Sequence, residues 1–169
     1  LNEGLSNEVD IVNLTANYEN EWGVFTSSSS WIDYEQLSLF DTSFLFGAPV
    51  DTEGRKAVDN FVQELRFTSD FDGQIQILAG FYYEDRESSR EFENLFTGDE
   101  IFESTVISFF ALPPLPENFS NKAILVEDVK QKAVFGEVSY GITEQITATI
   151  GARYFEYDSL LTLRIQALE

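Results

Sequence analysis

Residues 146–154 read Ile146-Thr147-Ala148-Thr149-Ile150-Gly151-Ala152-Arg153-Tyr154, and this stretch decides the fold class. Apolar side chains alternate with polar or small ones along its whole length. Because successive side chains of a β-strand point to opposite faces, a period of two is typical of a strand with one buried face. The stretch therefore predicts a β-strand with Ile146, Ile150 and Tyr154 on its apolar side.

The same alternation occurs in other parts of the chain. It places Ile77 and Phe81 on one face of a strand over residues 75–84, and it places Glu64 and Arg66 together on the polar face of a strand over residues 61–68. Further strands are expected at about residues 12–18, 22–34 and 131–140. The sequence thus predicts six strands.

The connections between these strands alternate between short and long. Short turns with turn-forming residues are expected at about residues 19–21, 70–73 and 141–145. Long polar loops are expected at about residues 35–59 and 86–128. Tight turns at one rim and long loops at the other are typical of outer-membrane β-barrels, and the expected strands of 9 to 13 residues are near the roughly 9 to 11 that cross a bilayer.

We therefore expect an all-β, antiparallel up-and-down meander that is part of a transmembrane β-barrel. Six strands cannot enclose a wide barrel, so the sheet should be open and curved. The chain begins at Leu1, without an initiator methionine or a signal segment, and we expect it to be an internal fragment of a longer protein. Tyrosines near strand ends predict an aromatic girdle: Tyr18, Tyr83, Tyr140 and Tyr154.

Composition excludes several classes of function. The formal net charge of -20 repels phosphate backbones, so nucleic acid is not an expected partner. The chain has no cysteine and no histidine, which removes thiolate metal sites and the most common catalytic base. We expect no cofactor, no metal site and no enzyme activity, and we interpret Asp70-Phe71-Asp72-Gly73 as a turn because a calcium loop needs more oxygen ligands.

Two hairpins of this sequence resemble those of TonB-dependent receptor barrels. The first resemblance is carried by residues 61–69, Gly73 and residues 77–83, the second by residues 133–140, Thr143 and residues 149–154. Together they cover about a third of the chain. The resemblance implies a barrel of about 22 strands around a plug domain, which this chain lacks.

The resemblance also implies partners and a location. These are the lipid of the Gram-negative outer membrane, the TonB complex acting through the missing plug domain, and a small-molecule or metal-chelate ligand such as an iron chelate. Two alternatives stay open: a soluble, acidic, antiparallel β-sandwich that acts as a binding module, and a passive porin. A sandwich should bury one continuous apolar face.

Candidate site residues fall into two groups. Polar side chains expected to face the lumen are Glu64, Arg66, Glu137 and Arg153. In the long loop, the rings of Phe102, Phe109 and Phe110 are candidates for ligand contact, with packing inside the loop as the alternative. Because that loop is acidic, we expect its ligand to be cationic, neutral or metal-bridged.

Overall fold

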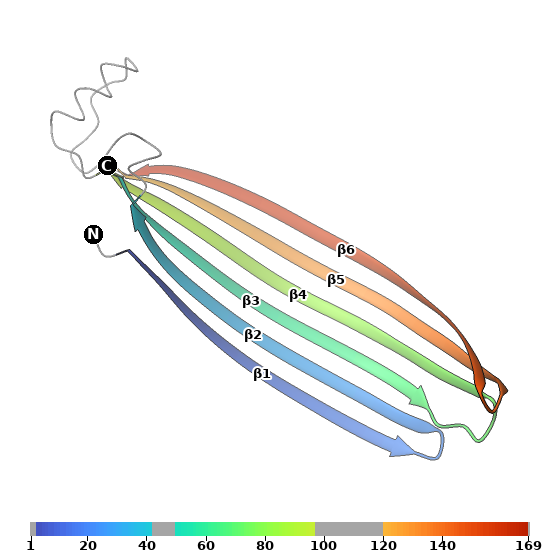
Figure 1. Cartoon of the computed structure of the whole chain (residues 1–169). Helices are drawn as coiled ribbons and strands as arrows, with labels where there is room; N and C mark the ends of the chain where they lie inside the picture. Colours follow the sequence, from blue (N-terminus) through green and yellow to red (C-terminus); the bar gives the residue numbers. More distant parts are fainter. Residues whose placement is uncertain (1–2, 42–49, 97–119, 169) are drawn as a thin grey trace.

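The architecture is a single antiparallel sheet of six strands (Figure 1). A computed structural model describes residues 3–41, 50–96 and 120–168 of the chain. Each strand pairs with the next along the sequence, which confirms the predicted meander. The strands are β1 (Gly4–Asn20), β2 (Gly23–Asp41), β3 (Val50–Ser69), β4 (Ile75–Phe96), β5 (Ser120–Thr143) and β6 (Ile146–Leu168).

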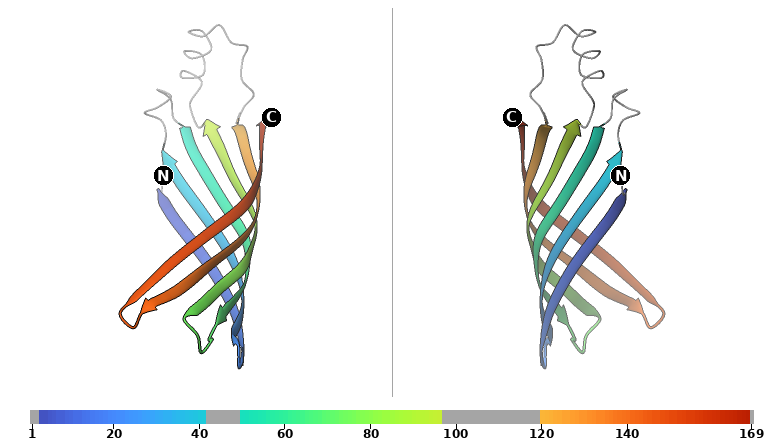
Figure 2. Two further views of the ribbon diagram at one scale, coloured as in Figure 1. Left: turned by 90° about the vertical axis from the view of Figure 1, so that its right-hand side faces the viewer. Right: turned by 90° about the vertical axis from the view of Figure 1, so that its left-hand side faces the viewer.

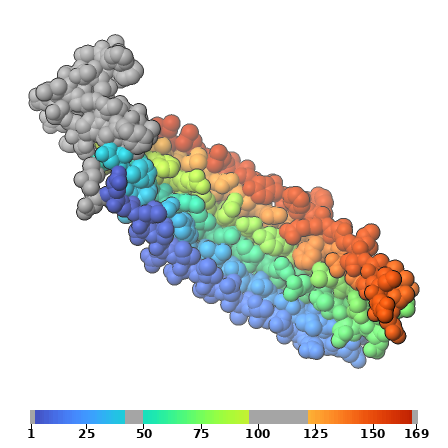
Figure 3. Space-filling view, viewed as in Figure 1, coloured from blue at the N-terminus to red at the C-terminus, as the bar shows by residue number. Residues whose placement is uncertain are grey.

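The sheet is open, curved and twisted (Figure 2). β1 forms one edge and β6 the other, and the space-filling view shows the strands side by side between these edges (Figure 3). Among the described residues, only Val50, Val129 and Ala133 are buried apolar side chains, so the described part of the chain encloses no core of its own. No helix long and apolar enough to cross a membrane occurs within the described ranges.

The strands are longer than predicted, at 17 to 24 residues. The expected loops at about 35–59 and 86–128 were therefore wrong in extent, because β2 continues to Asp41, β3 begins at Val50, β4 continues to Phe96 and β5 begins at Ser120. The physical reason is that backbone hydrogen bonds hold a ladder together whatever the side chains are. A search for apolar alternation misses strand segments without large apolar side chains, such as residues 53–56 of β3 and residues 86–91 of β4.

The ladder fixes which side chains share a face, because directly paired residues point to the same side. Phe81 pairs with Val134, which pairs with Tyr154, and Ile77, Val138 and Ile150 are linked in the same way. On the opposite side, Arg66 shares a row with Gly80, Phe135 and Arg153.

Burial identifies the curvature of the two faces. Along β2, side chains from Trp31 to Leu39 alternate between exposed and half-buried, and the half-buried ones lie on the Arg66 side. On β5, Val129 and Ala133 of that side are 1% and 3% exposed, whereas Val134 of the other side is 54% exposed. Side chains converge on the inside of a curved sheet, so we name the Arg66 side the concave face and the Ile150 side the convex face.

The turn between β1 and β2 depends on one glycine. Gly23 has a φ of 143°, and a Cβ atom there would lie 2.2 Å from the carbonyl oxygen of Thr68 and 2.7 Å from the Cα atom of Ser69. Both are backbone atoms of the adjacent strand and cannot swing away. The same region is linked to the next turn by a hydrogen bond of 2.9 Å from the Asp70 amide to the Trp22 carbonyl.

Gly23→Ala should therefore destabilise the protein by about 1–3 kcal/mol, the usual cost of a strained backbone conformation. Gly73→Ala is the matched control, since a Cβ atom at Gly73 meets nothing within 4 Å. Urea unfolding of the full-length protein measures both variants. Equal midpoints for Gly23→Ala and Gly73→Ala would contradict this account of the turn.

Candidate functional site: the two faces of the sheet

The convex face carries an apolar band between two aromatic rows. Nearer the short turns, the ring centroids of Tyr18 and Phe25 are 6.5 Å apart, and those of Phe25 and Phe67 are 4.6 Å apart. Farther along the strands, the Trp31 and Phe61 centroids are 5.3 Å apart. Phe25 and Trp31 are six residues apart on β2, which is about 20 Å along the strand.

The edge of this band runs obliquely across the strands. On β1, β2 and β3 the last apolar side chain before a charged one is Val12, Trp31 and Phe61, which lie in one cross-strand row. On β5 and β6 the last apolar side chain is Val134 and Tyr154, respectively. Each lies four residues nearer the short turns than the residue of its strand that is in the row of Phe61. The edge of the band therefore moves by about 14 Å along the strand direction over the roughly 24 Å that separates β1 from β6. This gives the edge a slope of about 30°, near the roughly 35–45° strand tilt of outer-membrane barrels.

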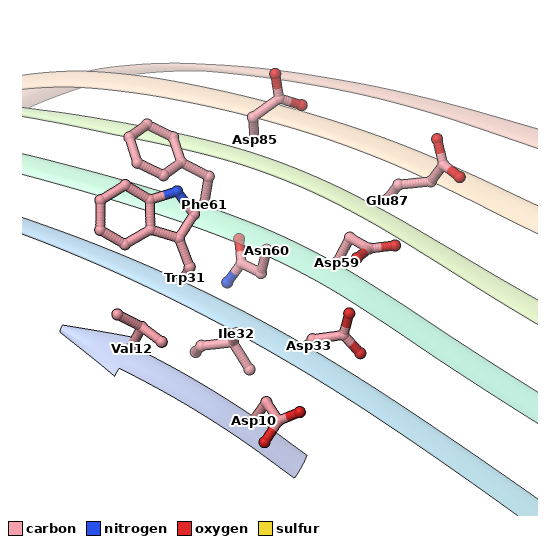
Figure 4. Close-up of a pocket in the computed structure, with 10 residues that line it drawn as sticks. All are labelled: Asp10, Val12, Trp31, Ile32, Asp33, Asp59, Asn60, Phe61, Asp85 and Glu87. Atoms are coloured by element: carbon pink, nitrogen blue, oxygen red, sulfur yellow. The ribbon is translucent and has the colours of Figure 1, made fainter. Parts of the chain in front are cut away.

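Carboxylates begin immediately beyond this edge. Figure 4 shows Asp10, Asp33, Asp59 and Glu87 in one row across four strands, next to the rings of Trp31 and Phe61. Together with Asp85 on β4 and Glu156 on β6, this row gives the band a sharp upper limit, because ionised groups are expensive to place in an apolar medium.

The polar side chains inside the band satisfy one another. Ser29 donates a hydrogen bond to Oε1 of Gln63, and Nε2 of Gln63 donates to Ser27 Oγ at 3.1 Å and to the Glu64 carbonyl at 3.1 Å. Polar groups that are paired in this way cost far less to remove from water than unpaired ones. These three residues therefore do not interrupt the apolar character of the convex face.

The concave face brings together three of the four polar residues predicted for a lumen. The guanidinium of Arg153 lies 5.2 Å from the ring centroid of Tyr82 and 5.8 Å from that of Phe135. The Tyr82 hydroxyl donates a 3.0 Å hydrogen bond to Glu84, and Arg66 lies 3.8 Å from Glu64, the cross-strand partner of Tyr82.

The fourth residue, Glu137, lies two residues from Phe135 on the same face. The remaining candidates, Phe102, Phe109 and Phe110, lie outside the described residues. Sequence reasoning missed the role of Gly80: a Cβ atom there would lie 2.2 Å from the Phe135 ring. Gly80 and Phe135 are cross-strand partners, so the ring fills the space above the glycine, an arrangement known to stabilise glycine in sheets.

The two faces also differ in charge. On the concave strands, five carboxylates (Glu19, Glu64, Glu84, Glu127, Glu137) balance five cations (Lys56, Arg66, Arg86, Arg90, Arg153). The convex strands carry only five cations, Arg55, Lys122, Lys130, Lys132 and Arg164. Their carboxylates number fifteen: Glu8, Asp10, Asp33, Glu35, Asp41, Asp51, Glu53, Asp59, Asp85, Glu87, Glu91, Glu93, Asp128, Glu156 and Asp158. The acidity of the strands is therefore concentrated on the convex face beyond the apolar band.

The fold occurs in solved structures. The chain is similar to the crystal structure of the ferric yersiniabactin uptake receptor FyuA from Yersinia pestis, with a TM-score of 0.64 and 14% sequence identity. The match covers 98% of this chain and 25% of that receptor chain, so this chain spans about a quarter of its length. No protein-family model matches the chain, and no curated protein matches its sequence.

The contact between Gly80 and Phe135 predicts a specific coupling. Gly80→Ala should destabilise the full-length protein by about 1–3 kcal/mol, the range for overpacking, because the Phe135 ring must move off the position that it occupies above Gly80. In a Phe135→Ala background the same change should cost little. A double-mutant cycle from urea unfolding measures the coupling, and equal costs of Gly80→Ala in both backgrounds would show that the ring is not what the new methyl group meets.

Proposed function

We propose that this chain is part of the barrel of an outer-membrane receptor that binds a scarce solute, such as an iron chelate, at the cell surface and imports it with energy from TonB. The observation that carries the proposal is the oblique apolar band on the convex face. It has aromatic rims and ends at a row of carboxylates, as a sheet needs when lipid covers one face.

Exposure of the band supports a lipid neighbour. Ile150 is 76% exposed and Tyr154 is 67% exposed, and among the described residues no second layer covers them. A soluble β-sandwich would bury this face in its own core. An apolar surface that extends over six strands is far larger than the scattered exposed residues of soluble proteins.

The concave face fits a wet interior. Its charges are balanced, and Arg153, Glu64 and Arg66 contact polar or aromatic neighbours on the same wall. We therefore propose that Glu64, Arg66, Glu137 and Arg153 face the lumen, where a plug domain from another part of the protein links solute binding to TonB. The proposal assigns no catalytic residue.

The first test concerns the lipid-facing side. Ile150→Arg in the full-length protein should impair assembly far more than Thr149→Arg, because an arginine on the lipid face costs about 2–4 kcal/mol near the bilayer midplane. The two positions are adjacent on β6 and point to opposite faces. Heat-modifiable gel mobility of outer-membrane fractions measures assembly, and equal yields would refute the proposed facing.

The second test concerns transport and the segment from residue 97 to 119. We propose that Phe102, Phe109 and Phe110 in this segment help to capture the solute. Replacing the segment with a short turn should reduce solute binding to cells at least severalfold while barrel assembly is retained. Unchanged binding would indicate that the segment only shields the barrel, and uptake that persists in cells lacking TonB would favour a passive porin.

A further inference from the structure

Two cations face each other on the concave face, near the ends of the strands that carry the long connections. Lys56 on β3 and Arg90 on β4 are direct cross-strand partners. Like charges in directly opposite positions destabilise a sheet, since their Cβ atoms are only about 4.5–5.5 Å apart. This pair therefore favours a bound anion between its members.

No carboxylate among the described residues forms an ion pair with either of these two cations. The ion pairs of the described chain involve Arg55, Arg66, Lys122 and Lys130, and neither Lys56 nor Arg90 forms one. On the concave face, the carboxylate nearest in the ladder is Glu127, whose partner Ser88 lies two residues from Arg90. Lys56 instead lies 5.3 Å from the ring centroid of Tyr34.

A hollow lies beside the two cations. A pocket of about 270 Å³ is lined by Gln36, Ser38, Gly54, Arg55, Lys56, Arg90 and Phe92. Gly54 keeps it open, because a Cβ atom there would lie 2.6 Å from Ser38 Oγ and 3.5 Å from the Phe92 ring. The Ser38 hydroxyl donates a 3.0 Å hydrogen bond to the Gly54 carbonyl, which holds this side of the pocket in place.

A third cation lies farther down the same face. Arg86 is four residues from Arg90 on β4, and its Nε atom is buried without a hydrogen-bond partner. The side-chain oxygen of its cross-strand partner Asn60 is also buried without a hydrogen-bond partner. Lys56, Arg90 and Arg86 thus form a cationic strip on the wall, in contrast to the acidic convex face behind it.

We propose that Lys56 and Arg90 bind a carboxylate or phosphate group of the transported solute at this pocket. The inference rests on the proposed function, because it requires that the protein receives a solute. It deepens that function by naming the solute's chemical class. Guanidinium and ammonium groups are the side chains that bind such oxyanions, and Arg offers a two-pronged hydrogen bond to either one. The pocket is large enough for one such group, so Lys56 and Arg90 hold one end of a larger solute.

The test uses the full-length protein in detergent at about 0.1 M ionic strength, where distant charges are largely screened. Calorimetric titrations with citrate and with inorganic pyrophosphate supply the carboxylate and phosphate probes. The Lys56→Gln/Arg90→Gln variant should bind the preferred probe at least tenfold more weakly. The anion that binds more tightly to the unmodified protein identifies the oxyanion.

The matched control is Lys122→Gln/Arg164→Gln, which removes two cations from the convex face at the same end of the sheet. This control should change binding less than twofold. Equal weakening in both double variants, or no binding of either anion up to about 10 mM, a very weak affinity, would overturn the inference.

Two further measurements separate this inference from the proposed function. Heat-modifiable mobility shows whether the Lys56→Gln/Arg90→Gln variant assembles, and TonB-dependent uptake shows whether the protein is a transporter. If uptake depends on TonB but anion binding is unchanged in the Lys56→Gln/Arg90→Gln variant, this inference is wrong and the proposed function stands. If the anions bind through this pair but the protein is absent from the outer membrane, the proposed function fails and the anion site stands.

Discussion

The rest of the structure depends on the register of one continuous hydrogen-bonded ladder. Five successive strand pairings connect β1 to β6, and the recorded register shift lies at Gly141 and Thr143, beside a turn. Because side chains alternate, a slip by one residue would send every apolar side chain to the other face. The register therefore places Ile150, Val138 and Ile77 in one cross-strand row and keeps Arg153 on the opposite face.

This constraint explains how a chain with a net charge of -20 presents a coherent apolar surface. Acidic residues occupy the convex strands only beyond the oblique edge that runs from Val12, Trp31 and Phe61 to Val134 and Tyr154, and the concave face balances its charges. The same strands thus carry three kinds of surface: an apolar band, an acidic surface beyond it, and a concave face whose charges balance. A period of two along each strand separates the faces, and distance along the strand separates the band from the acidic surface.

Local packing on the concave face depends on two glycines, which have no side chain. Gly80 and Gly54 each leave a gap in the row of side chains, but the two gaps are used differently. The Phe135 ring fills the first and lies 5.8 Å from the Arg153 guanidinium, whereas the second stays open beside Lys56 and Arg90. In a single sheet without an enclosed core, such cross-strand contacts supply much of the side-chain packing.

The sequence by itself determined the all-β class, the number and order of strands, and the faces of Ile150, Phe81 and Arg153, because alternation is a local property that each strand displays alone. It misjudged where the strands end, since the polar segments around Lys56 and Arg90 read as loops. Only the tertiary structure showed that these segments pair. Cross-strand register joins residues far apart in the chain, so the opposition of Lys56 to Arg90 and of Gly80 to Phe135, and the slope of the apolar band, were decided by pairing between strands.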